Sequence, residues 1–190
     1  MQSALSVPFE LGQHQEAIES LGKVGPEHPR SENARYYIAL GESRRGQPAK
    51  AVYVLLELAA GSPASFTYQH ELAKELNVLN RYAEAEAAYL KANELKPGRP
   101  EVHSGIGMAQ MMTGRVEKAI ANFEEAVRLK PSEQFYHMFL QVAKGRLSVL
   151  DSIPAMTREV QGKPKEVKRR LDLGRTLAFA TRFDEAEKQF

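Results

Sequence analysis

The chain has 190 residues, and its 26 Lys and Arg nearly balance its 24 Asp and Glu, which gives a net charge of +2. A charge this small excludes an electrostatic grip on a nucleic-acid backbone, so no nucleic-acid partner is expected. No apolar run reaches the ~18 residues that a membrane-spanning helix requires, so no membrane insertion is expected either. The chain has no cysteine, which excludes disulfides and cysteine-ligated metal sites and leaves the compartment open.

A period of 34 residues runs through the chain. It sets the spacing of four prolines, Pro29, Pro63, Pro97 and Pro131, and of four alanines, Ala17, Ala51, Ala85 and Ala119. Each alanine follows a residue suited to a tight turn by five positions, namely Gly12, Gly46, Asn80 and Gly114. Repeats of 20 to 50 residues are typical of proteins built from stacked supersecondary units. The chain is therefore predicted to restate one unit along its length.

The segment 100–133 shows what one unit contains. Pro100 suits the first position of a helix, and Gly114 suits a helix end because glycine adopts left-handed backbone angles at little cost. A second helix follows from Val116, with apolar residues on one broad face, and Pro131 ends it. Small residues such as Gly107 allow the two helices to approach closely. The unit is predicted to be an antiparallel helix pair.

These columns resemble the tetratricopeptide repeat. The matching positions are a small residue (Ala73, Gly107), a turn residue (Asn80, Gly114), an aromatic (Tyr82), alanine (Ala85, Ala119), an aromatic (Tyr89, Phe123), alanine (Ala92, Ala126) and proline (Pro97, Pro131). The resemblance implies an all-α, right-handed superhelical solenoid of about five antiparallel helix pairs. It also implies a concave groove lined by the first helix of each pair, which binds a protein or peptide without a cofactor.

The period divides residues 1–190 into parts of one solenoid. We expect a partial repeat at 1–31, regular repeats at 32–65, 66–99 and 100–133, a degenerate repeat at 134–166 and a partial repeat at 167–190. In the degenerate repeat, Asp151 or Ser152 would cap the second helix and Pro154 would lie in its first turn. Both ends cut through a repeat, so we expect the chain to be a fragment of a longer array or of a larger protein.

The resemblance places the candidate binding residues on the concave face. The early part of the groove is aromatic and polar, whereas the later part is rich in methionine, whose unbranched side chain adapts to irregular apolar partners. The predicted peptide-binding residues are Tyr36, Leu40, Arg44, His70, Lys74, Asn77, Ser104, Met108, Met111, Met112, Met138 and Val142. For Met111 and Met112, packing against the degenerate repeat is the alternative to ligand binding.

Other constellations point away from chemistry. The histidines at 70, 103 and 137 follow the period, but no column of carboxylates completes a metal shell, so packing or surface roles are expected and no metal. The two glycines flanking Ile106 lie inside a helix and indicate close helix packing instead of a phosphate loop. The basic run at 163–170 is flanked by carboxylates, so a solvated face is the first interpretation and an anionic ligand the second.

The sequence thus predicts a non-catalytic protein–protein interaction scaffold that binds a segment with apolar side chains. The alternative is a scaffolding or substrate-docking segment of a larger multidomain enzyme, such as a transferase. Self-association through the broken repeat ends is a third hypothesis, because apolar faces that would meet a neighbouring repeat are left there. Members of the family that clamp acidic carboxyl termini carry Lys and Asn where this chain has Tyr36 and Leu40, so a carboxylate clamp is not expected. The partner's identity stays open.

Overall fold

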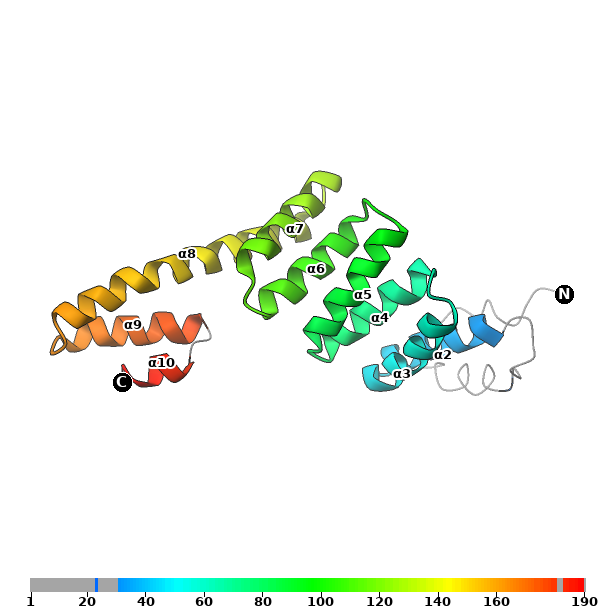
Figure 1. The fold of residues 1–190 in the computed structure, drawn as a ribbon, viewed down its shortest axis with the longest axis horizontal. Coiled ribbons are helices and arrows are strands. Elements are labelled where there is room, and N and C mark those ends of the chain that lie inside the picture. The colour runs from blue at the N-terminus through cyan, green and yellow to red at the C-terminus, as the bar shows by residue number, and fades with distance from the viewer. Residues whose placement is uncertain (1–22, 24–30, 181–182, 190) are drawn as a thin grey trace.

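The computed structural model describes residues 23, 31–180 and 183–189, and all the regular structure among them is helical (Figure 1). The predicted partial repeat at 1–31 lies almost wholly outside these residues. The helices are α2 (Ser31–Arg44), α3 (Pro48–Gly61), α4 (Phe66–Val78), α5 (Tyr82–Leu95), α6 (Pro100–Met112), α7 (Val116–Leu129), α8 (Gln134–Gly162), α9 (Val167–Phe179) and α10 (Phe183–Glu187). None of these helices is long and apolar enough to cross a membrane.

The first six helices form three consecutive pairs. Within each pair the helices pack against each other, and α3 packs on α4 as α5 packs on α6, so the pairs stack in chain order (Figure 1). The turns lie where the 34-residue period places them. Gly46, Asn80 and Gly114 have φ angles of 73°, 59° and 79°, the left-handed region that glycine and asparagine tolerate best. Pro48 and Pro100 open their helices, where a missing N–H costs no helical hydrogen bond.

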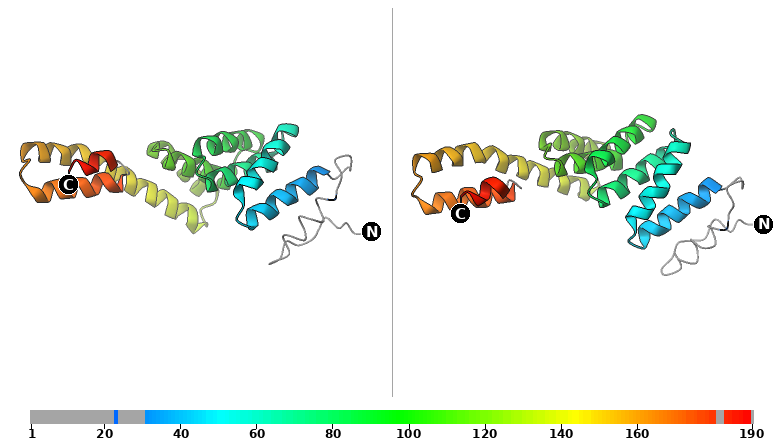
Figure 2. Two further views of the ribbon diagram at one scale, coloured as in Figure 1. Left: turned by 90° about the horizontal axis from the view of Figure 1, so that it is seen from below. Right: turned by 60° about the horizontal axis from the view of Figure 1, so that its bottom comes forward.

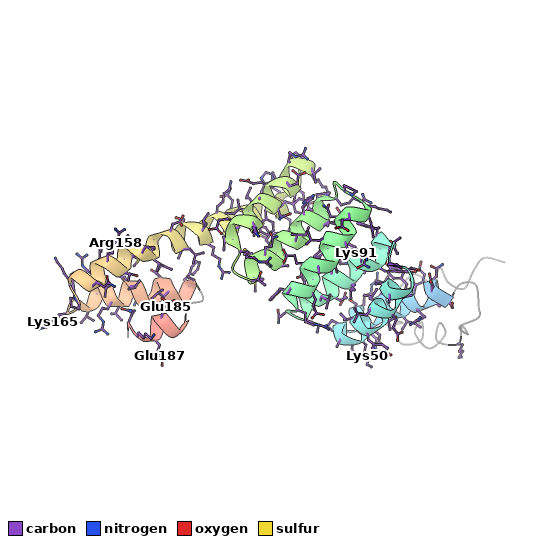
Figure 3. All side chains as sticks on the ribbon, viewed as in Figure 1. Lys50, Lys91, Arg158, Lys165, Glu185 and Glu187 are labelled. Atoms are coloured by element: carbon purple, nitrogen blue, oxygen red, sulfur yellow. The ribbon has the colours of Figure 1, made fainter. Side chains whose placement is uncertain are left out.

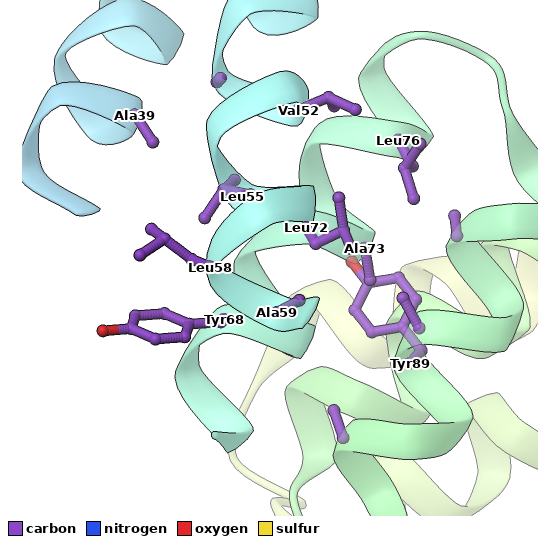
Figure 4. Close-up of a cluster of buried hydrophobic side chains, with 14 of the residues drawn as sticks. Ala39, Val52, Leu55, Leu58, Ala59, Tyr68, Leu72, Ala73, Leu76 and Tyr89 are labelled. Atoms are coloured by element: carbon purple, nitrogen blue, oxygen red, sulfur yellow. The ribbon is translucent and has the colours of Figure 1, made fainter. Parts of the chain in front are cut away.

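Small and large side chains alternate in the core between these helices. Ala51, Ala85 and Ala119 are fully buried at the equivalent place in three second helices. Around Ala73, Figure 4 shows leucines from neighbouring helices and the ring of Tyr89 filling the remaining space. Burying one leucine or phenylalanine side chain contributes about 1.5–3 kcal/mol, so this repeated layer is the main source of stability for the stack.

The predicted helix pair at 134–166 is wrong, because α8 runs as one helix of 29 residues. The position 34 residues after Gly114 is Ser148, which lacks glycine's freedom at positive φ and leaves the turn unmade. Ser152 does not cap a new helix. Its hydroxyl donates to the Val149 carbonyl oxygen at 2.7 Å inside α8, and Pro154 lies in the helix interior.

Because α8 does not turn back, it connects two separate cores. Its first half packs on α7 around Phe123, Leu140 and Ala143. Its second half packs on α9, which in turn packs on α10, around Ile153 and Leu173. The views of Figure 2 show α9 and α10 lying along the end of α8, away from α2 to α7. Charged side chains such as Lys50, Lys91, Arg158 and Lys165 stand on the outer surfaces of both parts (Figure 3).

Candidate protein-binding surface

The predicted binding residues lie on α2, α4, α6 and α8, and the structure gives them different environments. On α2, Tyr36 and Leu40 are half-buried and Arg44 is exposed. The Tyr36 ring packs 5.6 Å from the ring of Tyr68, centroid to centroid. Burial and the nearby Glu71 carboxylate raise the pKa of Tyr36 to about 12. Tyr36 therefore helps to join α2 to α4 and presents only part of its ring to solvent.

The residues on α4 belong to a polar cluster centred on Glu71. Lys74 donates from Nζ to the Glu71 carboxylate at 2.7 Å, and His70 Nδ1 lies 3.5 Å from it. Burial raises the pKa of the Glu71 carboxyl, but the hydrogen bonds and charges of His70 and Lys74 outweigh it, so this pKa lies below its usual value. The His70 ring stacks on Phe66 with centroids 5.5 Å apart. Asn77, one turn beyond Lys74, is half-buried.

Two of the predicted residues on α6 are not surface residues. Ser104 is buried, and Met111 belongs to the core cluster that contains Phe123 and Leu140. Met108 is half-buried and packs against that same cluster. The helix turns by about 100° per residue, so Met111 and Met112 face different ways, and only Met112 stays on the surface. Of the two explanations left open for these methionines, packing holds for Met111.

An exposed apolar surface remains on α8 and at the end of α6. The exposed fractions are 46% for Met112, 50% for Phe135, 51% for Met138 and 53% for Val142. Phe135, Met138 and Val142 follow one another at helical spacing, and we call these three residues the α8 patch. The edge of the Phe135 ring meets the Phe139 ring at 4.2 Å between centroids, so the patch has a firm base. The sequence analysis missed Phe135, although its place three residues before Met138 was a usable signal.

A second apolar hollow, which the sequence analysis did not predict, lies on the other surface of the stack. It is formed by α3, α4 and α5 and has a volume of about 460 Å³. Leu56 and alanines of α3 and α5 line it, with Leu72 and Leu76 of α4 at its base and Glu84 and Lys91 among its polar lining residues. The hollow marks where successive second helices diverge.

The histidines have separate partners. His103 Nδ1 lies 3.2 Å from the Asn122 side-chain oxygen, and His137 Nε2 lies 2.9 Å from the Pro131 carbonyl oxygen. Asn122 in turn donates to Gln110 at 3.0 Å, so His103 belongs to a polar network between helices. Among the described residues, no three His, Asp or Glu side chains gather where they could hold a metal ion.

The basic run after α8 is partly neutralised. Arg169 pairs with Glu159 of α8 and with Glu166, each at 2.6 Å between nitrogen and oxygen. The lysines at 163, 165 and 168 are exposed. The run therefore forms a solvated face with one firm ion-pair cluster that fastens α9 to α8.

Stacked antiparallel helix pairs with an open inner face define the class of helical-repeat solenoids, as the sequence predicted. Residues 70–133 match the sequence profile of the tetratricopeptide repeat. The chain is therefore a tetratricopeptide-repeat protein, by sequence over this segment and by fold over the described residues. No curated protein matches the whole sequence.

Solved structures share this fold at low sequence identity. MamA of MSR-1 has 20% identity and a TM-score of 0.64, over 72% of this chain and 79% of that one. The first repeat domain of RPAP3 (Spaghetti), bound to the HSP90 peptide SRMEEVD, has 17% identity and a TM-score of 0.60, over 63% and 94%. The second repeat domain of human RPAP3, in complex with the HSP70 peptide SGPTIEEVD, has 22% identity and a TM-score of 0.56, over 70% and 98%.

Proposed function

We propose that this protein is a non-catalytic interaction scaffold, which binds a protein segment through apolar side chains on the face formed by its first helices. The observation that carries the proposal is the exposure of Met112 together with the α8 patch. Large apolar side chains that gather on a surface at this exposure are typical of binding sites, because water contact with them is unfavourable.

The fold supports the proposal, since both RPAP3 domains hold short peptides. We do not carry over those peptides themselves. Both of them end in Glu-Glu-Val-Asp, and this chain has Tyr36 and Leu40, half-buried, where a first clamp pair would need Lys and Asn. An apolar ligand is the better match to the surface that the chain presents.

The test compares the proteins captured by the wild type with those captured by a double variant, Met112→Glu with Met138→Glu. Both residues are about half exposed, so the variant should fold and yet lose its specific partners. The matched control is Leu56→Glu with Leu90→Glu, two leucines on the second helices with exposed fractions of 44% and 47%. Quantitative mass spectrometry of the captured proteins should show losses of tenfold or more for the first variant alone. Equal capture by all three proteins would refute the proposal.

A further inference from the structure

One apolar stripe runs along the whole of α8. Its residues recur at intervals of three and four, which keeps them on one side of a helix with 3.6 residues per turn. From the first turn to the last, the stripe consists of Phe135, Met138, Val142, Gly145, Val149, Ile153, Met156 and Val160.

The second half of this stripe is already covered by helices. Ile153 is buried, and Met156 and Val160 pack against the same core, to which α9 contributes Leu173 and Leu177. This side of α8 therefore accepts a helix whose apolar residues are spaced by three and four. In the same interface, Glu159 of α8 meets Arg169 of α9 at 2.6 Å, so charge complementarity flanks the apolar contact.

The first half of the stripe has no such cover among the described residues. The α8 patch is half exposed, and Gly145, which ends this half, is exposed as well. The stretch from Phe135 to Gly145 is about 16 Å long at 1.5 Å per residue, the length of a helix of about 11 residues. The segment 134–150 contains no Asp or Glu, and Arg146 lies one turn beyond Val142.

We propose that the partner segment is an amphipathic helix with carboxylates beside its apolar face, which lies along the first half of α8 and continues the interface that α9 makes with the second half. This inference rests on the proposed function and specifies its ligand. The argument for a helix is the continuity of the stripe into an interface that a helix already fills. The argument for carboxylates is that α8 offers them a cation and no repelling acid in this half.

A labelled variant tests the inference directly. The chain has no cysteine, so Gln141→Cys places one environment-sensitive fluorophore beside Val142, and Lys91→Cys places the same fluorophore on α5 as a control. The probes are three synthetic 14-residue peptides. The first has leucines at intervals of three and four, flanked by glutamates, the second is a scrambled version of it, and the third has lysines in place of the glutamates.

The acidic helical peptide should change the emission at position 141 and leave that at position 91 unchanged, with affinity at least tenfold above both other peptides. Val142→Glu, combined with the label at 141, should weaken binding tenfold or more. Leu90→Glu, an equally exposed leucine on α5, should leave it unchanged. Binding no tighter than that of the scrambled peptide, or an affinity indifferent to Val142→Glu, would overturn the inference.

Two outcomes separate this inference from the proposed function. If capture of proteins depends on Met112 and Met138 but the acidic peptide behaves like the scrambled one, the scaffold function stands and the helical ligand is wrong. If light scattering shows a dimer that Met138→Glu converts to a monomer, the stripe is covered by a second copy of this chain, and the inference is likewise overturned.

Discussion

Gly105 lies within α6, with the ring of the buried Tyr89 directly against its backbone. A Cβ atom at this position would fall 2.6 Å from Cε1 and Cε2 of that ring, and closer still to Cζ. The ring is held between α4 and α6 and has no room to withdraw. We therefore expect Gly105→Ala to destabilise the protein by about 1–3 kcal/mol in urea denaturation, despite alanine's better helix propensity.

Gly145→Ala is the matched control for that substitution. Gly145 also lies inside a helix, but an added Cβ meets nothing within 4 Å. Only the lower backbone entropy of alanine in the unfolded chain then matters, and we expect a gain of about 0.5–1 kcal/mol. If both substitutions shift stability in the same direction, the close approach of Tyr89 to α6 is not what determines the effect.

Glu71 gives stability a defined pH dependence. Burial opposes ionisation, but His70 and Lys74 hold the pKa of the folded carboxyl below its ordinary value of 4.5. A lowered pKa means that the ionised group stabilises the fold above about pH 4.5, and that this contribution is lost as the pH falls through the folded pKa. The free energy of unfolding of the wild type should exceed that of Glu71→Gln at pH 7, and the gap should narrow below pH 4.5.

The control for this pH dependence is Glu94→Gln, at an exposed site on α5. Its difference from the wild type should stay small across the range, because an exposed carboxylate on a helix surface contributes little. A gap for Glu71→Gln that widens toward acid pH would contradict the assigned direction of the shift.

At the scale of the element, α8 is the exception to the repeat. Pro154 has no N–H to donate to the Leu150 carbonyl, so a helix interior that contains it loses a hydrogen bond, at a cost of up to about 3 kcal/mol. Pro154→Ala should therefore raise the stability of the α8–α9 region in urea denaturation followed by circular dichroism. Pro100→Ala, at the first position of α6, should change stability by less than about 1 kcal/mol.

The opposite result for Pro154→Ala would be informative. If removing this proline lowers stability, then Pro154 opens a helix in solution, and residues 134–166 form the helix pair that the sequence alone suggested. Helical content by circular dichroism distinguishes the two cases, because a continuous α8 gains order when the proline is removed.

Residues 134–166 also show where a prediction from sequence reaches its limit. Three regular pairs followed from turn residues, because Gly46, Asn80 and Gly114 supply backbone angles that few other residues adopt. In α8 the turn signal is missing at Ser148, and the sequence interpretation gave a cap at Ser152 and a first-turn proline more weight than the unbroken apolar stripe. Burial of that stripe against α9 overrides the local propensities.

The candidate surface was only partly predictable for a related reason. The period assigns a residue to the first helix, but burial depends on what the next helix places beside it. Ser104 and Met111 are covered, whereas Met138 and Val142 are exposed, since α8 runs straight on and no return helix follows it at this point. Phe135 joins them for the same reason.

At the scale of the whole molecule, α8 joins a stack of helix pairs to a terminal hairpin with its own core. The two cores share α8 and no cluster of buried side chains. In a repeat protein each unit is stabilised mainly by its neighbours, so a unit with one neighbour opens most easily. The hairpin of α9 and α10 should therefore exchange its amide hydrogens before α4 to α7 do.

Leu173→Ala tests this independence. Leu173 is among the most deeply buried side chains of the hairpin core, and its truncation should cost about 2–5 kcal/mol locally. Hydrogen exchange followed by mass spectrometry should then show faster exchange over 167–180 and the second half of α8, with protection of α4 to α7 unchanged. Leu55→Ala, in the core of the stack, should give the reverse pattern. Uniform loss of protection in both variants would mean that α8 transmits stability along its whole length and the two cores unfold as one.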